Sequence, residues 1–155
     1  MKTFFQGILL LSVGVQFAWA QNAEKIFSKT NDAVVKILAY HEDGTLHGQS
    51  SGVIVKKKEW LITNYHVLGD AVNLFAEHNG KKLKLDSVIA FDEKKDILVL
   101  HLVLPKTASE FKNIPDLTLE KSENLRVGQK IYAIGSPMGF ENTITEGIIS
   151  GLRTA

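Results

Sequence analysis

One histidine and one aspartate stand where they could act together in proton transfer. His66 follows the apolar stretch that begins at Trp60, and Asp96 comes thirty residues later, immediately before another apolar stretch. A histidine at a strand end can be held rigidly while its ring faces a cleft. An aspartate at the mouth of a buried strand can be largely desolvated and can hold that ring in one tautomer. Together they would form the general-base half of a Ser-His-Asp arrangement.

Spacing alone does not single out this pair. The chain has five histidines and seventeen acidic residues, and a bare pair of this kind is more often a solvated loop histidine and a turn aspartate. Asp92 lies beside the same apolar stretch and competes with Asp96 for the role. The remaining histidines show no metal-ligand spacing on one element and are interpreted as structural or surface residues: His41, His47, His78 and His101.

Short strands must position these residues. Val34–Tyr40 is rich in β-forming residues and is followed by the turn pair Asp43-Gly44. The stretch 97–104 is nearly all apolar, which predicts a strand buried on both faces. Two further strands are predicted at 130–135 and 143–150, whereas residues 23–29 carry the pattern of only one short helical turn.

The clearest local signal is a hairpin around Asn79-Gly80. Apolar and polar residues alternate before this pair from Val72 and after it through Leu85. Asn-Gly tolerates the positive φ angles of a type I′ turn, so the two runs are predicted to pair.

Short strands, frequent turns and no long amphipathic helix predict an all-β sandwich or barrel. Residues 105–124 form the least patterned stretch and are expected to be a long connection. Gly48 and Gly52 suit a close approach of strands, and Trp60 is expected in the core. The charged run 56–59 is expected to be a solvated hairpin tip.

Composition removes several classes of function. Lys and Arg total 18 against 17 Asp and Glu, and the only charge in the first twenty residues is Lys2. No electrostatic case for binding nucleic acid or an anionic membrane remains, because binding a polyanion needs a surplus of basic residues. The chain has no cysteine, which excludes disulfides, thiolate metal sites and a cysteine nucleophile.

The pattern of the N-terminal residues predicts a secretory signal. A positive start at Lys2 precedes a mostly apolar stretch over 4–17, and Ala18-Trp19-Ala20 provides small residues at a cleavage site. The apolar run is shorter than the roughly 20 residues that span a bilayer. We expect cleavage after Ala20, with an uncleaved anchor or a buried N-terminal helix as alternatives. An exported chain without cysteine favours a bacterial-type periplasm over a disulfide-stapled secreted domain.

Six short motifs occur in an order that gives the His/Asp pair a context. They cover 48–55, 61–67, 96–100, 125–130, 133–140 and 143–150. This series resembles the trypsin-like serine proteases of the HtrA/Deg type, which read G-x-G-S-G-F-I, T-N-x-H-V, D-[IL]-A-V-L, L-R-V-G, A-I-G-N-P-x-G and T-x-T-x-G-I-[IV]-S in the same order. The match covers about residues 33–152, nearly all of the chain after the signal.

The resemblance implies a trypsin/chymotrypsin-like double β-barrel with the first barrel complete and the second only begun. Residues 1–20 would be the signal peptide and 21–155 the peptidase domain. Within that domain the expected limits are about 33–104 for the first barrel, 105–124 for the connection and 125–155 for the start of the second barrel. His66 aligns with the general base and Asp96 with the residue that orients it.

The resemblance also implies a nucleophile that the printed sequence lacks. The family carries its serine in a G-N-S-G-G turn of the second barrel, and no such turn occurs among the 155 residues; the family's PDZ domains are missing as well. We therefore expect a piece of a longer serine endopeptidase. The alternatives are an inactive truncated module that binds peptides or a partner protease, and an enzyme completed by another chain.

The implied activity is hydrolysis of polypeptides with unfolded or exposed segments, in quality control of the cell envelope. The expected location is periplasmic or secreted, and no membrane span is expected after signal cleavage. No cofactor is implied, since acyl-transfer hydrolysis of this type needs none. A homotrimer is the assembly that the resemblance suggests.

Overall fold

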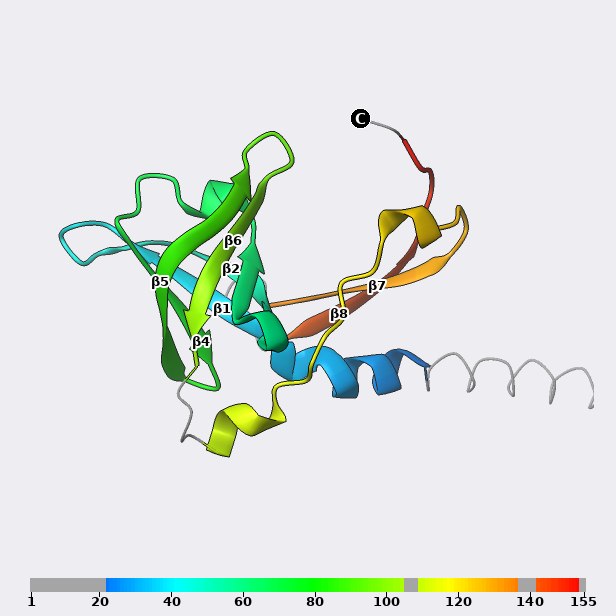
Figure 1. The fold of residues 1–155 in the computed structure, drawn as a ribbon, viewed down its shortest axis with the longest axis horizontal. Coiled ribbons are helices and arrows are strands. Elements are labelled where there is room, and N and C mark those ends of the chain that lie inside the picture. Colours follow the sequence, from blue (N-terminus) through cyan, green and yellow to red (C-terminus); the bar gives the residue numbers. More distant parts are fainter. Residues whose placement is uncertain (1–21, 105–108, 137–141, 154–155) are drawn as a thin grey trace, which may run out of the picture.

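A computed structural model describes residues 22–104, 109–136 and 142–153. Six strands form a closed antiparallel barrel in the order β1-β2-β3-β6-β5-β4, and β7 and β8 form a separate two-stranded sheet (Figure 1). The strands are β1 (Val34–Tyr40), β2 (Leu46–Val55), β3 (Trp60–Thr63), β4 (Asn73–His78), β5 (Lys81–Asp92), β6 (Ile97–Val103), β7 (Lys130–Gly135) and β8 (Thr143–Ile148). The all-β prediction is confirmed, and the closed barrel agrees with the first barrel of a trypsin-like fold.

The hairpin predicted at Asn79-Gly80 is confirmed. It joins β4 to β5, with Glu77 opposite Lys82 in the register. Asn79 has a φ of 49° and Gly80 a φ of 75°, the two positive angles that a type I′ turn requires.

The barrel interior is filled by one side of each strand. The largest fully buried side chains include Ile37, Ile54, Leu61, Leu83, Leu98 and Leu102. Burying such a side chain stabilises the fold by about 1.5–3 kcal/mol. Gly52 lies against this core, because a Cβ there would be 2.9 Å from Ile37 Cδ1. The close approach of strands expected at Gly48 is not observed, because a Cβ there would meet nothing within 4 Å.

The prediction that 97–104 is buried on both faces is wrong. Along β6 the buried residues alternate with more exposed ones. Leu98 and Leu102 are fully buried, whereas Ile97 and Val103 at the strand ends are 41% and 37% exposed. In an antiparallel barrel only the inner face of a strand packs on the core, so apolar composition alone overstates burial.

The connection after β6 is tied to the tip between β2 and β3. Two 3-10 turns, η4 (Ser109–Asn113) and η5 (Ser122–Asn124), lie in this connection, and its Phe111 and Ile114 are buried against the barrel. The tip is η2 (Lys56–Lys58). Lys56 Nζ donates to the carbonyl oxygens of Lys112 and Ile114 at 3.0 and 3.2 Å. Lys57 is exposed, as expected for a solvated tip. Lys56 is not free in solvent, because its two hydrogen bonds join the connection to the barrel.

Trp60 is only half-buried, not a full core residue, and the Lys58 ammonium lies 4.5 Å from its ring centre. A cation over the face of an aromatic ring is attracted by the negative charge density of that face.

The N-terminal helix is longer than the single turn predicted from the sequence. Residues 22–30 are helical and lead through η1 (Asn31–Ala33) into β1. Thr30 Oγ1 donates to the Ile26 carbonyl at 2.8 Å, and Phe27 lines a pocket with barrel residues. A helix this short is marginal by itself in water, so its formation depends on the folded chain around it and not on the sequence pattern alone. No helix among the described residues is long and apolar enough to cross a membrane. The predicted signal peptide lies outside those residues.

The β7–β8 ribbon extends away from the barrel (Figure 1) and is joined to it by polar contacts. The Ser136 amide donates to Ser51 Oγ at 2.8 Å. Asn142 Nδ2 donates to Asn31 Oδ1 at 2.6 Å. These contacts join the ends of β7 and β8 to β2 and η1.

Candidate active site

His66 lies in η3 (Tyr65–Val67), the short turn that follows β3. The strand before it is anchored by Thr63, which is 7% exposed and whose hydroxyl donates to the Ser51 carbonyl at 2.8 Å. Val67, directly after the histidine, is buried in the core. The backbone on both sides is thus fixed by the barrel, while the His66 side chain is 70% exposed.

Asp96 stands at the end of the turn between β5 and β6. Its φ is 55°, a left-handed conformation that aspartate and asparagine adopt more readily than most residues. Its amide donates to the Glu93 carbonyl at 3.2 Å. Two residues later Leu98 is fully buried, so the apolar strand holds the carboxylate in place.

Strand pairing brings the two residues together. β3 and β6 are neighbours, with Thr63 opposite Leu98. His66 Nδ1 lies 2.8 Å from Asp96 Oδ2, and the His66 amide donates to Asp96 Oδ1 at 2.9 Å. Residues thirty positions apart thus form a two-point contact in which ring and backbone of one histidine meet both carboxylate oxygens.

The carboxylate is held in its ionised form. The hydrogen bond from the His66 amide, followed by that of the His66 ring, lowers the pKa of Asp96 below its ordinary value of 3.8. An ionised carboxylate only accepts hydrogen bonds, so we assign the ring proton to His66 Nδ1. The other ring nitrogen, Nε2, then carries a lone pair and can accept a proton from a reacting group.

The sequence argument also expected Asp96 to be largely desolvated, and this is wrong. Its side chain is 40% exposed, because it sits in the turn that joins β5 to β6 rather than inside the barrel. Three hydrogen bonds to the carboxylate lower its pKa, whereas desolvation acts in the opposite direction.

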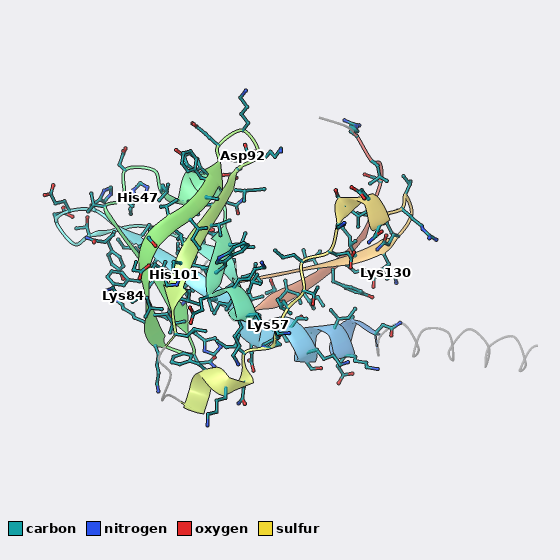
Figure 2. All side chains as sticks on the ribbon, viewed as in Figure 1. His47, Lys57, Lys84, Asp92, His101 and Lys130 are labelled. Atoms are coloured by element: carbon teal, nitrogen blue, oxygen red, sulfur yellow. The ribbon has the colours of Figure 1, made fainter. Side chains whose placement is uncertain are left out.

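The neighbouring aspartate has a different partner. Asp92 Oδ1 accepts the Lys95 amide at 3.0 Å, and Asp92 Oδ2 lies 3.5 Å from Lys95 Nζ. Asp92 lies at the tip of the hairpin (Figure 2) and closes its turn. The structure therefore pairs His66 with Asp96 and leaves Asp92 a turn residue.

Two contributors to this site had no role in the sequence argument. Asn64 Nδ2 donates to Asp96 Oδ2 at 3.0 Å, which fixes the oxygen that faces the ring. Tyr65 stacks on Phe91 with ring centres 5.4 Å apart, joining η3 to β5 beside the pair. Asn64 could have been noticed as the polar residue between a strand and the histidine; nothing in the sequence marks the stacked pair.

A small pocket of about 150 Å3 opens beside the histidine. Its lining comes from β1, β2 and η3: Ala39, His47, Gly48, Gln49, Ser50, His66 and Val67. A larger pocket of about 510 Å3 is lined by other residues, including the ion pair of Lys36 and Glu77 at 2.9 Å. Of these two pockets, only the small one is lined by His66.

Two of the remaining histidines have individual partners. His78 is 5% exposed, with Nε2 3.0 Å from the Asp32 carbonyl. His101 Nδ1 lies 2.8 Å from Asp86 Oδ1, and this hydrogen bond raises the pKa of His101. Within the part of the chain that the structure describes, no group of three or more His, Asp or Glu side chains could hold a metal ion.

Comparison with known proteins places this chain in a family. The model of the trypsin-like peptidase domain matches residues 50–154. "Protease Do-like 1, chloroplastic" of Arabidopsis thaliana is 36% identical over 138 residues, which cover 83% of this chain and 30% of the relative. "Probable periplasmic serine endoprotease DegP-like" of Hahella chejuensis is 39% identical over 113 residues, covering 72% of this chain and 23% of the relative. "Protease Do-like 5, chloroplastic" of Arabidopsis thaliana is 32% identical over 151 residues, 82% of this chain and 45% of the relative. The chain thus spans less than half the length of these relatives.

Proposed function

The chain belongs to the family of trypsin-like peptidase domains and is homologous to the DegP-like and Do-like serine proteases, and on that premise we propose that it supplies the histidine and aspartate of a serine endopeptidase. The observation that carries the proposal is the 2.8 Å contact of His66 Nδ1 with Asp96 Oδ2. The second bond, from the His66 amide to the same carboxylate, supports it because it fixes the carboxylate relative to the ring.

In the proposed reaction His66 Nε2 removes the proton from a serine hydroxyl as that oxygen attacks a peptide carbonyl. Asp96 remains ionised, keeps the ring in the tautomer that bears a proton on Nδ1, and stabilises the imidazolium that forms. His66 then gives the proton to the leaving amine. The serine would come from a G-N-S-G-G turn that the printed sequence does not contain.

The proposed substrates are polypeptides with unfolded or exposed segments. This part rests on the resemblance to HtrA/Deg proteases. Export rests on the N-terminal pattern, with cleavage after Ala20, and one of the relatives above carries the word periplasmic in its name. We propose an exported location, periplasmic or secreted.

The test starts from the native protein isolated from its source cells. Its intact mass and N-terminal sequence are measured, and it is treated with a fluorophosphonate probe that labels activated serines. In a nucleophile-bearing form, His66→Ala should reduce hydrolysis of unfolded casein by about 10⁴-fold or more, because the triad acts as a unit. His101→Ala is the matched control and should retain activity. Casein hydrolysis that is unchanged in His66→Ala refutes the proposal.

A second candidate is a module that binds peptides or a partner protease without cleaving them. The observation that favours it is the apolar surface of the β7–β8 ribbon, where Ile131 and Ile148 are 39% and 61% exposed. An open sheet edge with apolar side chains can accept an extended segment by strand addition. A native mass equal to residues 21–155, without probe labelling but with saturable binding of an unfolded peptide, selects this function.

A further inference from the structure

Two histidines that play no part in the proposed proton transfer face each other across the β1–β2 hairpin. His47 Nδ1 lies 3.1 Å from His41 Nε2, and the two rings meet at 81° with centres 4.6 Å apart. The hairpin backbone fixes both positions, since the His41 amide donates to the Thr45 carbonyl at 2.9 Å. His47 is exposed and His41 half-buried, so solvent reaches the pair.

The separation of the two nitrogens matches the bite of a metal ion. Imidazole nitrogens bind Zn²⁺ at about 2.0–2.1 Å. Two such ligands lie about 2.9 Å apart at a square-planar angle and about 3.3 Å apart at a tetrahedral angle. The 3.1 Å between His47 Nδ1 and His41 Nε2 falls between these values. We propose that His41 and His47 form a binding site for a divalent transition-metal ion, Cu²⁺ or Zn²⁺, with water completing the coordination.

The proton arrangement allows this binding without loss of a proton from either ring. A neutral imidazole carries one N–H and one lone pair. With His47 coordinating through Nδ1 and His41 through Nε2, each ring carries its proton on the other nitrogen, and the ring that donates the present hydrogen bond moves its proton there. The hydrogen bond between the rings is replaced by two bonds to the ion.

A carboxylate near the His41 and His47 rings favours the binding of a cation there. Asp43 lies in the turn of the same hairpin, where its Oδ1 accepts hydrogen bonds from the amide and the hydroxyl of Thr45 at 2.9 and 2.6 Å. A negative charge close to the histidine pair attracts a divalent ion.

The His47 ring is restrained on its other side. A Cβ added to Gly69 would be 2.7 Å from His47 Nε2, so the ring packs closely against this glycine. Packing of this kind reduces the rotamer freedom that metal binding would otherwise have to remove. Figure 2 shows His47 on the barrel surface, away from the β7–β8 ribbon.

The site adjoins the pocket beside the proposed base. His47 and His66 both line that pocket, so an ion on His41 and His47 would lie at its edge. Metal binding is measured independently of hydrolysis, and therefore the metal site and the proposed function can fail separately.

The test uses the untagged full chain, because a polyhistidine tag would bind the same ions. Titration with Cu²⁺ followed by electron paramagnetic resonance, and with Zn²⁺ followed by calorimetry, measures stoichiometry and affinity. We expect one ion per chain with nitrogen ligands. His41→Gln and His47→Gln should each weaken binding by more than about tenfold, since removal of one of two side-chain ligands exceeds the effect of outer-shell changes.

Two control variants separate this site from the other histidine contacts. His101→Gln removes the histidine paired with Asp86, and His66→Gln removes the one paired with Asp96. Both should bind Cu²⁺ with the affinity of the unchanged chain, and circular dichroism checks that every variant is folded. Loss of binding only in His66→Gln or His101→Gln overturns the inference. So does undiminished binding in His41→Gln and His47→Gln, or the absence of stoichiometric binding by the unchanged chain.

Discussion

Replacement of Asp96 by asparagine tests how the carboxylate controls the histidine. Asparagine keeps the shape of the side chain and tolerates the φ of 55° at this position. It replaces one of two acceptor oxygens by an NH₂ group, which only donates. The present carboxylate accepts from the His66 amide, the His66 ring and Asn64 Nδ2.

The orientation of the new amide follows from these contacts. If its oxygen continues to accept the His66 amide, its NH₂ group takes the place of Oδ2 and faces His66 Nδ1 and Asn64 Nδ2. His66 Nδ1 must then accept, which moves the ring proton to Nε2. A ring with its proton on Nε2 cannot take the proton of a nucleophile, and loss of about 10⁴-fold in turnover is the expected scale for such a tautomer change.

The tautomer can be measured in the chain itself. Nitrogen-15 chemical shifts of the His66 ring should show a protonated Nδ1 in the unchanged protein and a protonated Nε2 in Asp96→Asn. Asp92→Asn is the matched control, because Asp92 accepts from Lys95 and does not contact the ring. An Asp96→Asn ring that keeps its proton on Nδ1, or an equal change in Asp92→Asn, refutes the reasoning.

Two further predictions concern stability. Gly52→Ala should lower the free energy of unfolding by about 1–3 kcal/mol through overpacking, because the new Cβ meets the Ile37 and Leu61 side chains at 2.9 and 3.1 Å. Gly48→Ala is the control, since a Cβ there meets nothing within 4 Å. Urea unfolding of both variants measures the difference, and equal effects would contradict the prediction. The hydrogen bond to Asp86, with a smaller contribution from Glu59, raises the pKa of His101 above 6.5. The stabilisation of the fold by charged His101 is therefore complete below pH 6.5 and is lost as the pH rises through the folded-state pKa of His101. The difference in unfolding free energy between the unchanged chain and His101→Gln should shrink over that rise, and a difference independent of pH would show that the pair does not contribute.

Local signals predicted those parts of the fold that depend on a few consecutive residues. The Asn79-Gly80 turn and β1 and β7 were predicted with their observed limits, because φ preference and β-propensity act within a short stretch. The burial of β6 was predicted wrongly, since the same apolar side chains suit a strand covered on one face or on two. Only the closure of the barrel decides that its outer face meets solvent.

For the candidate site too, the sequence predicted some features and only the structure showed the others. The order of the motifs around His66 and Asp96, through the family resemblance that they carry, was sufficient to select the pair and to predict a general-base role. The sequence could not choose by geometry between Asp92 and Asp96, nor show that Asn64 contacts the carboxylate. Those contacts depend on the pairing of β3 with β6, which sets distances between residues thirty positions apart.

The sequence by itself determined the residue chemistry, the hairpin turn and the family. The tertiary structure alone decided the distances at which Asp96 meets the histidine, why its pKa falls while it remains 40% exposed, and that His41 and His47 face each other at 3.1 Å. The physical reason is that backbone preference acts between neighbours in the chain. Hydrogen bonds between side chains depend on distances that are set only when the strands pair.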